Sequence, residues 1–369
     1  MSGMPPREMT MRSLKTLALL CFVLVTGPCL ADAGPAPLKG HDGQHDFDFN
    51  VGTWHTHIRY LQHPLSDHES WTSFDGTVVG RKLWDGQANF EEIEADGPAG
   101  HFEGMTLSLY DKQAQQWSQY FANSDSGAVD APSIGSFQDG HGDFYGQTTV
   151  EGKTVLVRMI WKDFTPTSHH VEQSFSADGG KTWEINFIGE LTATTEQPKV
   201  PTAFADPTQH DFDWQLGSWD IHMKRMLHPL SSAETWTNYD GKVEVSKVWG
   251  GRANLALIDT QGPSGHLQFL SLRLYEPKSR QWTLNFAHAG SYLLGSPMHG
   301  QFRGGKGEFY DQSTLDGKGI LERFTFEVVK PGSSTRDEQA FSADGGKTWE
   351  VNWINTQQTS LDDEGLNVN

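Results

Sequence analysis

The chain has little cysteine and no long apolar run. Its two cysteines, Cys21 and Cys29, both lie within the first 30 of its 369 residues, and the rest of the chain has none. The apolar segment 17–25 has nine residues and no later one is as long, whereas a helix that crosses a bilayer needs about 20. The sequence therefore predicts a main body without disulfides or a membrane span, stabilised by its hydrophobic cores.

The first 33 residues have the order of a secretory signal peptide. Three basic residues precede the apolar segment, a glycine-proline pair ends it, and the small residue Ala33 follows. We expect cleavage after Ala33 and export to the periplasm or the extracellular space. A lipid anchor on Cys29 is the disfavoured alternative, because Pro28 precedes that cysteine and would obstruct processing.

Positive charge is scarce. Lysine and arginine number 28 against 47 acidic residues, a net charge of −19. Removing the predicted signal peptide, with three basic and two acidic residues, gives −19 − 3 + 2 = −20. This sign disfavours nucleic acids and other polyanions as partners. We expect neither a nucleic-acid partner nor a membrane span, and the oligomeric state stays open.

The main positive feature is an internal repeat at an offset of 165 residues, which becomes 166 after a one-residue insertion. A unit of this size has its own core, whereas solenoid and propeller units repeat every 20 to 50 residues or so. The strings that recur are His45–Phe49 as His210–Trp214, Gly52–Trp54 as Gly217–Trp219, and Ser176–Glu184 as Ser342–Glu350.

The repeat predicts two tandem domains. The first copy covers residues 45–191 and the second covers 210–358. Between them, the proline-containing segment 192–209 is predicted to be a linker. Residues 34–44 are expected to form an N-terminal linker and residues 359–369 a C-terminal tail.

Alternation with a period of two predicts the fold class. It is clear in 105–110, 154–161 and 270–275, and glycine-containing turns separate such runs. Many short strands in about 150 residues are typical of a β-sandwich or an antiparallel barrel. We expect an all-β chain of two tandem antiparallel barrels, because closure removes edges that neighbouring sheets would otherwise offer each other.

The repeated strings also carry a resemblance. His45–Phe49 with Gly52–Trp54, and Phe175–Glu184 at the end of the copy, resemble the bacterial secreted proteins of domain of unknown function 1579. That resemblance implies a lipocalin-like (calycin) barrel with no assigned reaction. Nitrobindins share this barrel type and bind haem, but the chain lacks their extended glycine-rich first-strand motif, so we expect no cofactor.

The segment Ser176–Trp183 also fits the Asp-box pattern of sialidase propellers. One such box in each domain is too few for a propeller, which needs four to eight blades or so. We expect a hairpin turn in which Asp178 accepts amide hydrogens and Trp183 packs beneath.

Candidate ligand-binding residues are polar and aromatic groups that both copies retain. Two histidines lie in His-Pro-Leu turns and two others follow Gly-Pro-x-Gly turns. No spacing of histidine, cysteine or acidic residues indicates a metal site, and no catalytic residue is assigned. The candidates are His63, Trp71, His101, Arg158 and Glu172, with His228, Trp236, His266, Arg323 and Glu338 in the second copy.

Arg158 and Glu172 are expected to lie opposite each other on neighbouring strands, as are Arg323 and Glu338. Arg158 shares its face with residues that are expected to enter the barrel. Two alternatives remain open: a structural ion pair across the strands, or a guanidinium that anchors the acidic end of an apolar ligand.

Two classes of function fit this sequence. The first is an exported protein that binds a small apolar or amphipathic molecule in each aromatic-lined barrel. The second is an exported lyase, isomerase or hydrolase that uses histidine or acidic groups within the barrel. We favour binding, because the chain has no Gly-x-Ser-x-Gly elbow or nucleotide-binding loop. One copy alone can also be active, since His141, His169 and His170 occur only in the first.

Overall fold

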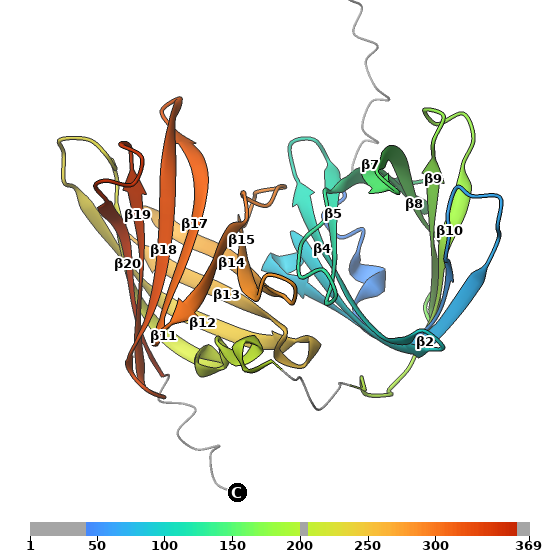
Figure 1. The fold of residues 1–369 in the computed structure, drawn as a ribbon, viewed down its shortest axis with the longest axis horizontal. Coiled ribbons are helices and arrows are strands. Elements are labelled where there is room, and N and C mark those ends of the chain that lie inside the picture. Colours follow the sequence, from blue (N-terminus) through green and yellow to red (C-terminus); the bar gives the residue numbers. More distant parts are fainter. Residues whose placement is uncertain (1–41, 200–205, 360–369) are drawn as a thin grey trace, which may run out of the picture. The chain divides into compact units, whose positions relative to one another are not determined.

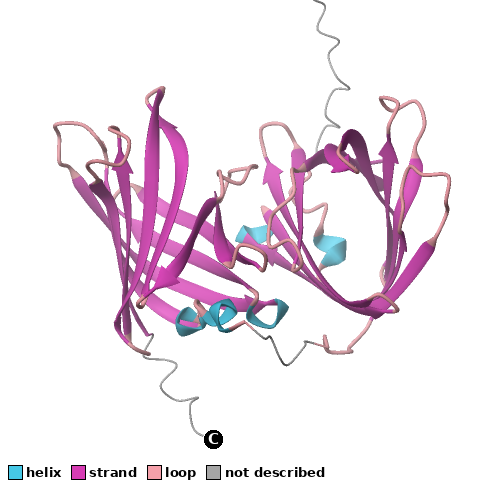
Figure 2. Cartoon of the chain, viewed as in Figure 1, coloured by secondary structure: helices cyan, strands magenta, loops and turns pink. Residues whose placement is uncertain are grey.

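The structure is a computed structural model that describes residues 42–199 and 206–359. These residues form two closed antiparallel β-barrels of ten strands each, with a few short 3-10 turns (Figures 1 and 2). The predicted all-β class and tandem barrels are confirmed. The predicted signal peptide and its cleavage site lie outside the described residues. Among the described residues, no helix is long and apolar enough to cross a membrane.

The first barrel is a meander in which each strand pairs with its neighbours along the chain and β1 pairs with β10 to close the ring. The 3-10 turn η1 (Asp48–Asn50) precedes β1, and η2 (Trp84–Gly86) joins β2 to β3. The strands are β1 (Gly52–Leu61), β2 (Trp71–Leu83), β3 (Ala88–Gly97), β4 (Gly100–Asp111), β5 (Gln116–Asn123), β6 (Ser133–Gln138), β7 (His141–Val150), β8 (Lys153–Thr165), β9 (Ser168–Ser176) and β10 (Glu184–Ala193).

The second barrel repeats this topology, and β11 pairs with β20 to close it. Its 3-10 turns are η3 (Pro207–His210), η4 (Asp213–Gln215) and η5 (Trp249–Gly251). The strands are β11 (Gly217–Met226), β12 (Trp236–Val248), β13 (Ala253–Gly262), β14 (Gly265–Glu276), β15 (Gln281–His288), β16 (Met298–Arg303), β17 (Lys306–Leu315), β18 (Lys318–Lys330), β19 (Ser334–Ser342) and β20 (Glu350–Thr359).

The period of two in the sequence becomes the inward and outward alternation of the barrel wall. In β1, Trp54 and Ile58 are buried, whereas His57 faces outward and its Nδ1 lies 2.8 Å from an oxygen of Asp75. Trp54 also ties the wall to the preceding 3-10 turn, because its indole Nε1 donates to the carbonyl oxygen of Asn50 at 3.0 Å.

The aromatic residues of the repeated His-Asp-Phe-Asp string are packing elements. Phe47 is buried, with its ring edge-on to Trp117 and Phe137, both at a centroid distance of 4.9 Å. In the second copy, Phe212 meets Trp282 in the same way at 5.0 Å. Such edge-to-face pairs add about 0.5–1.5 kcal/mol each beyond the burial of their area.

The Asp-box segment forms the predicted hairpin turn. Asp178 accepts the amide hydrogens of Lys181 and Thr182 at 3.0 and 2.9 Å, and the Trp183 indole donates to the carbonyl oxygen of Gly180 at 3.1 Å. These bonds, led by the backbone of Thr182, lower the pKa of Asp178 to about 2. The second copy has the same bonds, so the motif is structural.

Buried residues on the outer faces of both barrels form one core cluster. Leu107 and Leu109 of β4 belong to it together with Leu270, Leu272 and Leu274 of β14, and all five side chains are fully buried. Because these leucines point away from their own barrel interiors, the residues between them along each strand point inward. The interiors therefore receive polar side chains in the middle of two apolar strands.

We predict that Gly241→Ala destabilises the second barrel. A Cβ at this position of β12 would lie 1.9 Å from the carbonyl oxygen of Asp259 on the paired strand β13. The backbone must then shift, at a cost of about 1–3 kcal/mol in the free energy of unfolding, measured by denaturant titration. Gly319→Ala is the matched control, because a Cβ there meets nothing within 4 Å. Equal stability losses in both variants would contradict the steric explanation.

Candidate functional site

A chain of hydrogen bonds crosses the interior of the second barrel. Arg273 Nη1 donates to Gln215 Oε1 at 2.5 Å, and Gln215 donates to Gln357 at 2.9 Å. Gln357 and Asn355 then donate to the two carboxylate oxygens of Asp337, at 2.8 and 2.5 Å. These five residues, here called the second-barrel network, are all buried.

Burial shapes the charges of this network. Desolvation lowers the pKa of Arg273 to about 10 and raises that of Asp337 to about 6, and each group partly offsets the shift of the other. The guanidinium also lies over the rings of Phe212 and Phe326, at 4.6 and 5.1 Å from their centroids. Two buried groups of opposite charge thus coexist because hydrogen bonds and aromatic faces replace their water shell.

A cavity of about 660 Å³ lies next to this network. Its walls include four aromatic side chains, and Asn355 belongs both to the lining and to the network. Arg225 also lines the cavity, with its guanidinium 5.6 Å from the ring centroid of Trp353. The size falls in the range of about 300–1,000 Å³ that is typical of small-molecule sites. The aromatic lining residues are Phe269, Phe286, Phe324 and Trp353.

The first barrel lacks the acidic half of this network. At the positions of Asp337, Asn355 and Gln357 it has Val171, Gly189 and Leu191, which occupy the same places in the strand register. Its buried aromatic cluster includes two of these residues together with interior tryptophans and phenylalanines. The two interiors are therefore chemically different in spite of the repeat.

The first barrel instead buries a carboxyl group whose hydrogen-bonding partners are neutral. Glu91 of β3 lies in the interior, where desolvation raises its pKa to about 7, partly offset by hydrogen bonds with Asn50 and Thr106. The matching residue of the second barrel is Ala256. At neutral pH, Glu91 is thus close to the point at which it gains or loses its proton.

His169 is a second buried titratable group of the first barrel. Its side chain lies among the rings of Phe49, Trp54 and Trp161, at centroid distances of 5.0, 4.4 and 5.9 Å. Neither ring nitrogen has a hydrogen-bond partner among the described residues. Burial lowers the pKa of His169 to about 4, so the ring is neutral at physiological pH and packs as an aromatic group.

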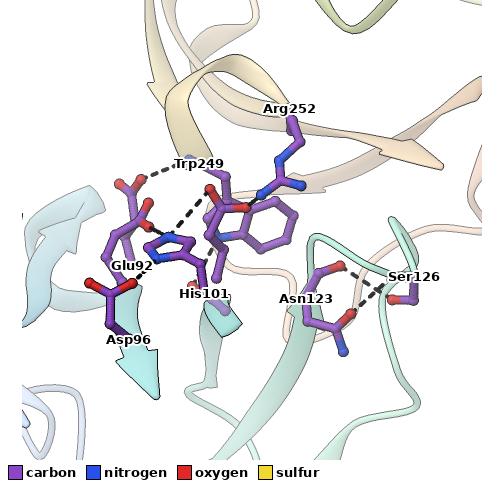
Figure 3. Close-up of polar contacts among 10 residues, drawn as sticks. Glu92, Asp96, His101, Asn123, Ser126, Trp249 and Arg252 are labelled. Atoms are coloured by element: carbon purple, nitrogen blue, oxygen red, sulfur yellow. Dashed lines mark hydrogen bonds and ion pairs between the residues drawn. The ribbon is translucent and has the colours of Figure 1, made fainter. Parts of the chain in front are cut away.

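On the outer face of the first barrel, His101 is the centre of a polar group. Its Nδ1 lies 2.8 Å from an oxygen of Asp96, and its Nε2 lies 2.8 Å from Glu94 Oε2 (Figure 3). Glu103 completes the group, and its carboxylate pairs with Arg252 from the second barrel. We call Glu94, Asp96, His101 and Glu103 the hairpin cluster. Burial raises the pKa of Glu94 to about 7.

None of the ten candidates from the sequence lines the cavity. His63 and His228 lie in exposed loops, where their carbonyl oxygens accept from Ser66 and Ser231 at 2.8 and 2.7 Å. Trp71 and Trp236 open β2 and β12 and are half-buried, and His266 bonds Asp259 on the surface of the second barrel. Of the ten candidates, His101 is the one that the structure places in a dense polar cluster of the described residues.

The expected pairing of Arg158 with Glu172 is wrong. Arg158 lies opposite Ser174, and Glu172 bonds Lys162 and His170 at 2.8 and 2.9 Å. The reason is that β8 and β9 continue to a two-residue turn, with Thr165 opposite Ser168. After a one-residue register shift between Lys162 and Thr165, the pairing lies two residues away from the expected one. Arg158 instead lies 4.7 Å over the ring of the Asp-box residue Trp183.

The second-copy pair is also wrong. Arg323 lies opposite Ala340 and stacks 4.6 Å over the ring of Trp349, while Glu338 bonds Arg336. Both arginines therefore pack against the tryptophans of the Asp-box turns. A cation over an aromatic face adds roughly 0.5–1 kcal/mol at an exposed site. Neither lines the second-barrel cavity.

The residues that sequence reasoning missed are polar side chains inside apolar strands. Arg273 follows Leu272 and precedes Leu274, and Glu91 follows Phe90. A charged residue that alternates with apolar residues in a strand indicates that the polar face of the strand points into the barrel. This inference holds only if the apolar residues are known to be covered from outside. That cover comes from the other barrel.

Comparisons with known proteins give no family for this chain. No family model matches it and no curated protein matches it. Solved structures that match include a protein of unknown function of the DUF3598 family from Nostoc punctiforme, 10% identical with a TM-score of 0.26, which covers 87% of this chain and 100% of that one. A transferrin-binding protein B variant from Haemophilus parasuis is 6% identical with a TM-score of 0.19, over 84% and 77% of the two chains.

At these TM-scores neither likeness supports an argument about function. The resemblance to domain of unknown function 1579 is not confirmed by these comparisons. The barrel fold itself rests on the strand pairing of this chain.

We predict that Glu91→Gln makes the protein less sensitive to pH. In the folded wild type the Glu91 carboxyl group keeps its proton up to about pH 7, whereas in the unfolded chain it loses the proton near pH 4.5. The wild type therefore loses stability as the pH rises between these values. The free energy of unfolding of the variant should exceed that of the wild type increasingly over this range and level off above it. At about 1.36 kcal/mol for each pH unit, the change is on the order of 3 kcal/mol.

Denaturant titrations at half-unit steps from pH 4 to 8 measure this difference. Glu190→Gln, which removes an exposed carboxylate of β10, controls for the loss of one negative charge. A wild-type-to-variant difference that stays constant over the whole range would show that Glu91 ionises alike in the folded and unfolded chains.

Proposed function

We propose that the protein binds a small amphipathic molecule in the cavity of the second barrel. The observation that carries this proposal is the combination of an aromatic cavity of about 660 Å³ with a hydrogen-bonded polar network next to it. An apolar body would lie against Phe269, Phe286 and Phe324. Its polar end would meet the amide groups of Gln339 and Asn355, which also line the cavity.

The energetics of the cavity favour such a ligand. Burial of apolar surface contributes about 25 cal/mol for each Å², so a ligand that covers about 100 Å² of apolar wall gains roughly 2.5 kcal/mol from the wall before the costs of association, and burial of its own apolar surface adds to this. Asn355 is held by Asp337, which fixes the direction of its side-chain amide. A fixed amide costs little further ordering when it binds the polar end of the ligand.

The two barrels differ in the ligand binding that we propose for them. The sequence analysis expected one ligand in each barrel, but the first barrel has Val171 and Gly189 where the network has Asp337 and Asn355. We therefore assign the ligand to the second barrel. The export predicted from the first 33 residues would place binding in the periplasm or outside the cell.

We predict that Gln339→Trp abolishes binding of the neutral fluorophore N-phenyl-1-naphthylamine. The tryptophan ring fills the cavity, so the fluorescence increase that accompanies binding of the probe to the wild type should fall at least tenfold. Gln173→Trp is the matched control, because Gln173 occupies the same position in the first barrel. Probe binding that survives Gln339→Trp but is lost in Gln173→Trp would contradict the assignment.

Native mass spectrometry of the mature protein purified from its exported location tests the same proposal with the natural ligand. We expect one small molecule for each chain, and its release and identification under denaturing conditions would give the ligand class. Two molecules for each chain would show that the first barrel binds as well.

A further inference from the structure

The β3–β4 hairpin gathers four ionisable side chains on one face. The register pairs Glu94 with Glu103 and Asp96 with His101 across the two strands. Residues two apart on a strand point to the same side, and directly paired residues have Cβ atoms about 4.5–5.5 Å apart. The turn between the strands therefore brings the whole hairpin cluster together without help from distant parts of the chain.

Two of these carboxylates are buried with oxygens left unbonded. The side chains of Glu94 and Glu103 are 1% and 0% exposed. Within the described part of the chain, Oε1 of each is buried and has no hydrogen-bond partner. A buried carboxylate oxygen without a partner is costly, which points to a ligand that these oxygens share.

His101 directs its second ring nitrogen toward both buried carboxylates. Asp96 bonds Nδ1 at 2.8 Å, which leaves Nε2 facing Glu94 Oε2 at 2.8 Å and Glu103 Oε1 at 3.9 Å. One donor atom from each of the three residues lies within 4.8 Å of the others. A carboxylate that holds the far nitrogen of a ligating histidine is the usual outer partner of a metal-bound imidazole.

The charge of the site also suits a divalent cation. The three carboxylates carry three negative charges, and Arg252, which pairs with Glu103, balances one of them. Beside the cluster, the indole of Trp249 donates to the carbonyl oxygen of Gly104 at 2.9 Å and its amide donates to Glu92 (Figure 3). This cover limits competition from water.

We propose that Glu94, His101 and Glu103 bind one divalent transition-metal ion. One imidazole and two carboxylates suit Zn²⁺ better than the oxygen-only sites that Ca²⁺ and Mg²⁺ prefer. Three protein ligands leave the fourth position of a tetrahedral ion to a water molecule or a small ligand. This inference concerns the outer face of the first barrel and does not depend on ligand binding in the second.

The second barrel supplies a natural control. Its matching hairpin has Asp259, Gln261, His266 and Gln268, so two of the three carboxylates are replaced by amides. Gln268 donates to Asp259 at 2.8 Å, and the side chains of Asp259 and His266 are 59% and 50% exposed. With one carboxylate left and with Asp259 and His266 exposed to solvent, this hairpin should bind the metal far more weakly.

Calorimetric titration of Zn²⁺ into the mature full-length protein, with any affinity tag removed, tests the proposal. We expect one ion for each chain. His101→Ala and Glu103→Gln should each weaken binding at least tenfold, and His266→Ala should leave it unchanged. Asp96→Ala, which removes an exposed side chain and so spares the fold, should weaken binding about 10–100-fold through the orientation of His101.

Replacement of Zn²⁺ by Co²⁺ adds a second readout, because the visible absorption of bound Co²⁺ reports its ligands. The bands expected for the wild type should be lost in His101→Ala. Absence of stoichiometric Zn²⁺ binding to the wild type, or binding that neither Asp96→Ala nor His101→Ala weakens, would overturn the proposal.

Discussion

The packing of leucines on the outer faces of β4 and β14 is the constraint on which the site chemistry depends. Leu107 and Leu272 are buried in a core to which both barrels contribute. A strand alternates its side chains, so outward leucines oblige their neighbours to face inward. Ser271 and Arg273 enter the second barrel for this reason. The barrel therefore gains polar groups where a barrel exposed to water would have an apolar wall.

These inward polar groups have diverged between the two copies. Arg273 brings a positive charge into the second barrel and is accompanied by Asp337, while Ser108 stands at the matching position of the first. The first barrel has Glu91 instead, without a basic partner among its hydrogen bonds and charge interactions. One topology thus holds two different interiors, because the wall is maintained by backbone pairing and tolerates different side chains inside.

The hairpin cluster on the outer face of the first barrel is assembled in a different way. The hairpin cluster arises from strand register alone, since its four residues lie on adjacent strands joined by a short turn. What the rest of the fold adds is burial, through Trp249 and Arg252. Because Glu94 and Glu103 are buried, their unbonded carboxylate oxygens are costly.

The spacing of histidine, cysteine and acidic residues along the chain predicts no metal site, because it matches none of the compact patterns of known zinc sites. A hairpin register in which residue numbers sum to 197, set by the Gly97 to Gly100 turn, would have paired Glu94 with Glu103 and Asp96 with His101. That signal was present in the sequence. The failed pairing of Arg158 with Glu172 shows the limit of such sums, because the sum depends on the position of the turn, here between Thr165 and Ser168, and on any bulge beside it.

The sequence by itself determined the all-β class, the duplication and the Asp-box turns, because strand alternation and turn chemistry are local. Only the tertiary structure decided which face of β4 and β14 points inward, since both faces are buried and the alternating pattern is the same for either choice. The position of the cavity, the charge network beside it and the burial of Glu94 and Glu103 follow from that choice. They depend on contacts between residues more than a hundred positions apart, which no local pattern encodes.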